Sequence, residues 1–120
     1  MAKKITVITR YFWPEGGGAE QATYLVVRDV LSQVGDVTVI SGTRKPAVVN
    51  GVNYVHWNSL SRSSKSRVLL ESMLRFGDIK RVIMESDIVY IPSNAVLPLA
   101  IPVRRVNPSA GLSFTSMISK

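Results

Sequence analysis

A run of three glycines, Gly16-Gly17-Gly18, separates two segments of different periodicity near the start of the chain. Before it, Ile5-Thr6-Val7-Ile8-Thr9 is a short β-branched run that predicts a strand. After it, apolar residues recur at helical spacing from Ala19 to Val34, and Gly35 supplies a C-terminal stop signal. A strand that enters a helix through a glycine turn indicates the opening of a parallel α/β sheet.

The next β-branched run, Val37-Thr38-Val39-Ile40, is closed by Ser41-Gly42. The helix before it is long enough for a right-handed crossover between parallel strands, so residues 5–41 predict a βαβ unit. Asn53-Tyr54-Val55-His56-Trp57 alternates weakly and is either a third strand or an edge hairpin.

The second half of the chain continues the alternation of strand and helix. Ser59–Ser66 is polar and basic without periodicity, which predicts an exposed loop. Apolar residues between Val68 and Ile83 predict a helix interrupted at Gly77-Asp78, and 87–91 predicts a buried strand. Pro98 and Pro102 either kink a helix over the apolar residues 95–106 or divide it into short pieces, and 112–115 begins a last strand. We therefore expect one Rossmann-like α/β domain over residues 1–120, with a mostly parallel sheet flanked by helices.

Composition excludes several kinds of site. The chain has no cysteine, which removes disulfides, thiolate zinc sites and cysteine nucleophiles, and fits a reducing cytoplasm. His56 is the one histidine, and beside Trp57 on a weak strand we expect it to be structural. With scattered carboxylates, neither a metal cluster nor a nucleophile–base–acid set can be assembled. We expect no metal and no resident cofactor.

The net charge of +7 is unevenly distributed, because no acid falls between Val37 and Leu70 or after Asp87. Such an excess favours phosphate-bearing partners, whether nucleic acid, anionic lipid or nucleotide. The alternative is that the charge serves solubility alone. No apolar run reaches the ~18 residues of a membrane span. We therefore expect a soluble, cytoplasmic protein, with peripheral contact to a membrane as a further option.

The glycine turn has two interpretations. A helix N-terminus carries unpaired N–H groups and a partial positive charge, and glycines let a phosphate approach the backbone. Alternatively, the glycines only allow tight packing of strand and helix. Two familiar phosphate motifs do not match, because Gln21 occupies the third glycine position of a dinucleotide fingerprint and no Gly-Lys-Ser/Thr triplet occurs.

The segment from Tyr11 to Glu20, YFWPEGGGAE, resembles the start of the family-four glycosyltransferases, which have the two-domain GT-B fold. The matching positions are Phe12, Pro14, Glu15, Gly17, Gly18, Ala19 and Glu20, with Gly16 at a position that the family leaves variable. Later strands, 36–40 and 86–91, are also similar to the family pattern. The resemblance implies that residues 1–120 form the N-terminal, acceptor-side domain of such an enzyme.

The resemblance also implies roles for individual residues. The glycine turn lies against the diphosphate of a nucleotide-sugar, which makes Gly16, Gly17 and Gly18 the expected donor contacts. Glu20 either bonds a substrate hydroxyl or, as we favour, caps the helix, because a carboxylate there competes with a phosphate for the helix dipole.

The aromatic and basic residues around these positions each allow two roles. Tyr11, Phe12 and Trp13 either stack on a sugar or lipid-linked acceptor or cover the end of the sheet. Arg62, Lys65 and Arg67 either meet lipid-linked phosphates at a membrane or belong to a solvated loop.

Two family features are absent from the sequence. No donor-binding domain with a paired-glutamate motif follows, and Thr115–Ser119 lacks the histidine that the family commonly uses there. We therefore expect a truncated domain with unknown catalytic residues that is inactive without a separate donor-domain chain. An uncovered apolar face makes self-association a reasonable expectation. The alternatives are a non-enzymatic basic module that binds nucleic acid or anionic lipid, with nucleic acid ranked low, and a folded gene remnant.

Overall fold

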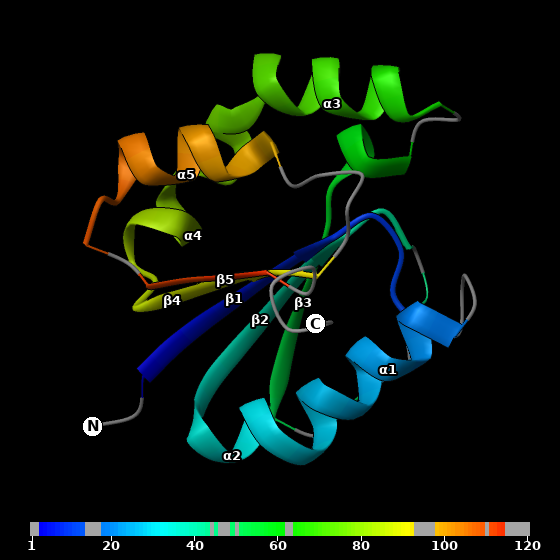
Figure 1. Cartoon of the computed structure of the whole chain (residues 1–120), viewed down its shortest axis with the longest axis vertical. Coiled ribbons are helices and arrows are strands. Elements are labelled where there is room, and N and C mark those ends of the chain that lie inside the picture. The colour runs from blue at the N-terminus through cyan, green and yellow to red at the C-terminus, as the bar shows by residue number, and fades with distance from the viewer. Residues whose placement is uncertain are drawn as a thin grey trace.

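A parallel sheet with helices on both faces organises the chain in the computed structural model (Figure 1). The structure describes residues 3–13, 18–43, 45, 49, 51–61, 64–92, 98–109 and 111–114. The five strands are β1 (Lys3–Thr9), β2 (Gly35–Ser41), β3 (Val52–His56), β4 (Ile88–Ile91) and β5 (Gly111–Phe114). They lie in the order β3-β2-β1-β4-β5, and every pairing is parallel. The predicted α/β class and its mostly parallel sheet are confirmed.

The helices form one layer on each face of this sheet. The first layer is a continuous helical stretch made of α1 (Gly18–Val26), the π-helical turn η1 (Val27–Leu31) and α2 (Ser32–Val34). The second layer lies on the opposite face and holds the 3-10 turn η2 (Asn58–Ser61), α3 (Lys65–Leu74), the 3-10 turn η3 (Phe76–Asp78), α4 (Lys80–Met84) and α5 (Ala100–Val106) (Figure 1). The interruption predicted at Gly77-Asp78 is therefore real, because η3 separates α3 from α4.

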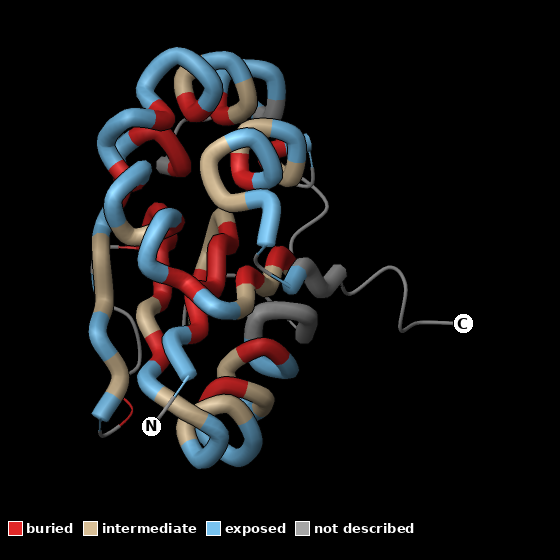
Figure 2. Tube along the Cα trace, turned by 90° about the vertical axis from the view of Figure 1, so that its left-hand side faces the viewer, coloured by how far each residue is buried: buried red, intermediate tan, exposed pale blue. Residues whose placement is uncertain are grey.

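Two hydrophobic cores result from the alternation of side chains along the central strands. Ile5 and Val7 of β1 point toward α1 and pack with Val27. Ile8 points to the other face and packs with Ile83 of α4. Figure 2 shows the buried segments gathered along the sheet and on the inner sides of the helices. Strand β1 is buried from Ile5 to Thr9 because helices cover both of its faces.

The edge strand and the serine-rich segment differ in part from expectation. The weakly alternating residues near Tyr54 form a parallel edge strand, β3, and no hairpin. The prediction of an exposed loop over residues 59–66 is wrong at two positions. Leu60 is fully buried within η2, and Lys65 already begins α3. The Ser64 side chain accepts a hydrogen bond from the Arg67 N–H and caps that helix, so part of the serine run is a helix start.

Gly35 ends the first helical stretch and begins β2 with no residue between them. A Cβ at this position would lie 2.1 Å from the backbone oxygen of Lys3, its neighbour in β1. The pairing of β1 with β2 therefore requires glycine here.

We expect Gly35→Ala to lower the free energy of unfolding by about 2 kcal/mol or more, because backbone must move to admit the methyl group. Urea unfolding followed by circular dichroism measures the change. Gly77→Ala is the matched control, since a Cβ at Gly77 meets nothing within 4 Å and the change should be close to neutral. Equal stability of the two variants would contradict this close approach.

Candidate functional site at the carboxyl end of strand β1

The strand order creates a topological switch point between β1 and β4. From β1 the chain moves outward through β2 to β3, and then returns to the other side of β1 for β4 and β5. In doubly wound sheets, ligands bind outside the carboxyl ends of the strands at this point. The predicted site residues follow β1 directly. The sheet therefore places residues 10–13, which follow β1, at the edge where such folds bind ligands.

Only part of the predicted phosphate contact can be located. Gly18 is the first residue of α1, at the N-terminus of the helical stretch. Gly16 and Gly17 lie outside the described residues, as does the side chain of Glu20. The helix start is therefore where the sequence predicted it.

Hydrogen bonds tie the segment after β1 to the segment after β2. The Phe12 N–H donates to Thr43 Oγ1 at 2.9 Å, and the Gly42 N–H donates to the Arg10 carbonyl at 3.0 Å. Thr9 Oγ1 donates to the Tyr11 carbonyl at 2.9 Å and holds the start of the segment. Thr43, which sequence reasoning missed, thus positions residues 10–13 through its hydroxyl group. Its position just after a β-branched strand was the available signal.

Phe12 differs from its two aromatic neighbours. Its side chain is 0% exposed and belongs to the core beneath α1. The ring lies edge-on to Tyr24 at 6.1 Å between centroids and is tilted against Tyr54 at 5.9 Å. The prediction of Phe12 as an acceptor contact is therefore corrected, because a fully buried ring cannot stack on a substrate. Phe12 covers the end of the sheet instead.

Tyr11 and Trp13 keep part of their surface accessible beside the buried Phe12. The Arg10 guanidinium lies over the Tyr11 ring, 5.0 Å from its centroid, in cation–π geometry. These two aromatic rings remain available to a ligand at the switch point. Lys45, beyond Thr43, is also exposed.

Tyr54 supports Phe12 from β3. Its hydroxyl oxygen accepts a hydrogen bond from the Val49 N–H at 2.8 Å. Burial disfavours the charged phenolate and raises the pKa of Tyr54 above its ordinary value. The aromatic group of Phe12, Tyr24 and Tyr54 is therefore a structural support for the candidate site.

His56 lies away from the switch point. It is exposed at the carboxyl end of the edge strand β3, and β2 separates that strand from β1. Its neighbour Trp57 is buried and donates from Nε1 to Asp78 Oδ2 at 3.2 Å. The structural role expected for His56 is therefore not seen, because its side chain is exposed and the buried side chain here is that of Trp57. His56 also lies away from the switch point.

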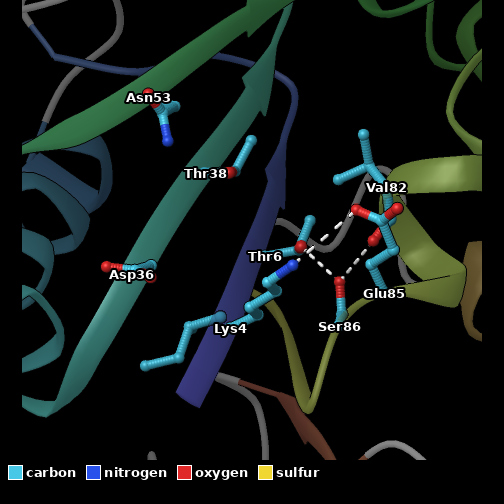
Figure 3. A pocket seen from close by; sticks show the side chains of 9 residues that line it. Lys4, Thr6, Asp36, Thr38, Asn53, Val82, Glu85 and Ser86 are labelled. Carbon is cyan, nitrogen blue, oxygen red and sulfur yellow. Dashed lines mark hydrogen bonds and ion pairs between the residues drawn. The ribbon is translucent and has the colours of Figure 1, made fainter. Parts of the chain in front are cut away.

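A polar cavity of about 260 Å³ lies near the amino ends of β1 and β2, away from the switch-point site (Figure 3). Thr6 Oγ1 and Ser86 Oγ are 2.5 Å apart, and Ser86 donates to the Val82 carbonyl at 2.7 Å, so Thr6 is the donor between the two hydroxyls. Lys4 Nζ lies 3.9 Å from a Glu85 carboxylate oxygen. The signal for this cavity was polar residues at alternate strand positions, which the β-branched pattern concealed. Lys4 thus pairs with Glu85, while Asp36 also lines the cavity, which lies near the opposite ends of the strands from residues 10–13.

We expect Phe12→Ala to lower the free energy of unfolding by about 3 to 5 kcal/mol, because it empties a fully buried site between two rings. Tyr11→Ala is the control, and we expect it to cost about 1 kcal/mol because Tyr11 is half-buried. Urea unfolding at neutral pH compares the two. A Phe12→Ala variant as stable as Tyr11→Ala would show that the ring is not a core anchor.

Stability should fall in alkaline solution through Tyr54. Its folded pKa is raised, so its contribution is fully present below the unfolded value of 10.0 and is lost as the pH rises above it. Urea midpoints measured from about pH 8 to about pH 11 test this. Tyr54→Phe should show a shallower decline above pH 10.0. A decline of the same slope would assign the effect to other groups.

The described residues also bear on metal binding and on membrane insertion. They hold no group of three His, Cys, Asp or Glu side chains that could bind a metal ion. Within the same residues, no helix combines the length and apolar character needed to cross a membrane. No family model, curated protein or solved structure matches the chain, so its own residues and strand order carry the functional assignment.

Proposed function

We propose that this chain is the acceptor-side, N-terminal domain of a GT-B glycosyltransferase and forms one wall of its substrate cleft. One observation carries the proposal: the glycine-rich segment that resembles this family leaves β1 at the switch point of the sheet and enters α1 at Gly18. Every strand-to-helix connection of a parallel sheet lies at its carboxyl edge, so the resemblance of this segment to the family is what favours ligand contact over packing alone.

The helix start supplies the chemistry for a diphosphate. The helical stretch from Gly18 runs without a break to Val34, so its first turn presents N–H groups and the positive end of a dipole. Gly16, Gly17 and Gly18 are the proposed contacts for the phosphates of a nucleotide-sugar. Glu20 is proposed as a helix cap and not as a donor contact, because its negative charge repels a phosphate at the same helix end.

The residues just after β1 are proposed to form the acceptor side. Tyr11 and Trp13 retain accessible aromatic surface, and sugars and lipid-linked acceptors both pack against such rings. The buried Phe12 between them fixes both neighbours through its backbone bond to Thr43. In this proposal Tyr11 and Trp13 contact the acceptor, and Phe12 holds these two residues in position.

Transfer requires groups that this site does not contain. His56 is on the far edge strand, and no acid–base set lies among the described residues at the switch point. We propose that a donor-binding domain outside residues 1–120, in the cytoplasm, supplies the opposite wall and the remaining catalytic groups. The chain alone is expected to bind weakly and to transfer no sugar.

Titration of the ¹⁵N-labelled chain with uridine diphosphate tests the phosphate site. We expect amide shifts at Gly16, Gly17 and Gly18 with a millimolar dissociation constant, because one wall of the cleft provides only part of the binding energy. Gly17→Val should abolish the shifts, since its side chain would occupy the space of the phosphate. Gly77→Ala is the matched control and should retain them.

The proposal fails if no nucleoside diphosphate shifts these amides. It also fails if Gly17→Val binds as well as the unmodified chain. Amide shifts confined to the residues around the polar cavity, such as Thr6 and Ser86, would show that the ligand binds in that cavity instead.

A further inference from the structure

We propose that the outer surface of α3 and α5 docks on an anionic lipid bilayer. We define this docking face by Leu70, Met73 and Leu74 of α3 and Ile101 of α5, together with the arginines Arg67, Arg104 and Arg105. The proposal does not depend on sugar transfer. It rests on exposed apolar side chains, on their position opposite the core, and on charge.

Helix α3 has three of its large apolar residues, Leu70, Met73 and Leu74, on the side that faces away from the protein. Leu70 is 61% exposed and Leu74 is 75% exposed, whereas Ser72 is fully buried. Ser72 Oγ has no hydrogen-bond partner within the part of the chain that the structure describes. A helix adapted to water would place leucine inside and serine outside. The inverted arrangement points to an apolar environment on the outer side.

Helix α5 has the same arrangement. Val103 is fully buried, and Ile101 on the opposite side of the helix is 65% exposed. Arg104 and Arg105 in its last turn are exposed as well. Val68 of α3 and Val103 join the same core cluster, so the outer sides of both helices face away from the sheet in one layer (Figures 1 and 2).

The charge of the layer that contains α3 and α5 indicates what kind of partner would bind there. Exposed basic side chains occur throughout this layer: Arg67, Arg75, Lys80, Arg81, Arg104 and Arg105. Of its acids, Glu71 is half-buried, Asp78 accepts from Trp57, and Glu85 lies beside Lys4. The layer therefore presents excess positive charge around its apolar residues.

An anionic bilayer accounts for both properties together. Leucine and isoleucine side chains enter the boundary of the acyl chains, while arginines reach the lipid phosphates. Duplex DNA would use the charge but leave the leucines in water. The opposite layer supplies a contrast, because Val30 and Val34 are half-exposed there but Arg28 is paired with Asp29 at 2.8 Å. Exposed apolar side chains and exposed arginines thus coincide on α3 and α5.

Co-sedimentation of the full chain with vesicles tests the proposal. We expect binding to vesicles of phosphatidylcholine mixed with phosphatidylglycerol, weakening as salt is added, and little binding to phosphatidylcholine alone. The double variant Leu70→Gln/Leu74→Gln should lower the partition coefficient by about tenfold or more. The double variant Arg104→Gln/Arg105→Gln should lower it by about fivefold per residue on anionic vesicles.

Val30→Gln/Val34→Gln is the matched control, because these side chains have similar exposure on the other layer and should leave binding unchanged. Circular dichroism confirms that each variant folds, and the leucine variant should keep any uridine diphosphate shifts at Gly16–Gly18. Loss of those shifts in Gly17→Val without loss of vesicle binding would separate the two proposals.

Three results would overturn the docking face. One is equal binding of the leucine variant and the unmodified chain to anionic vesicles. Another is equal binding to neutral and anionic vesicles. The third is absence of vesicle binding together with a dimer, seen by sedimentation, that Leu70→Gln/Leu74→Gln dissociates.

Discussion

The pairing of β1 on both of its edges is the constraint on which the rest of the structure depends. β1 pairs with β2 along its whole length, from Lys3 opposite Gly35 to Thr9 opposite Ser41, and with β4 on its other edge. Its side chains alternate between two cores, so a one-residue slip against β2 would exchange the two faces. Gly35 holds that register, because only glycine permits the close approach to Lys3. The same strand delivers residues 10–13 to the ligand-binding edge of the sheet.

Much of the fold could be predicted because its strands are short β-branched runs and its first helix has a clear apolar periodicity. The segments around Val7, Val39 and Val89 all lie in strands, and Ala19–Val34 lies in one helical stretch. The strand order could not be predicted, because it depends on contacts between distant residues. The prediction of an exposed loop in the serine-rich segment, residues 59–66, was wrong for a different reason. Ser64 is a helix cap and Leu60 is a core residue, and composition alone does not distinguish either from a loop.

The start of the first helix was predictable, but the different environments of the aromatic residues before it were not. Glycine between a strand and a helix marks a switch-point edge, and the first helix begins at Gly18. Three adjacent aromatic residues gave no indication that the middle one, Phe12, is enclosed by Tyr24 and Tyr54, because those rings come from α1 and β3. Thr43 was missed because its position after a β-branched strand does not show that its hydroxyl bonds to the backbone of a distant segment. The outward leucines of α3 match a helical period, but a period does not say which side is buried.

The direct junction of the first helical stretch with β2 has a mechanical consequence. Because α2 ends at Val34 and β2 begins at Gly35, no loop joins the helical stretch to the strand. The last residue of the helix is therefore followed at once by a residue in the ladder with β1, where Gly35 lies opposite Lys3. Movement of the helical stretch relative to the sheet is restrained at this end by the strand pairing itself.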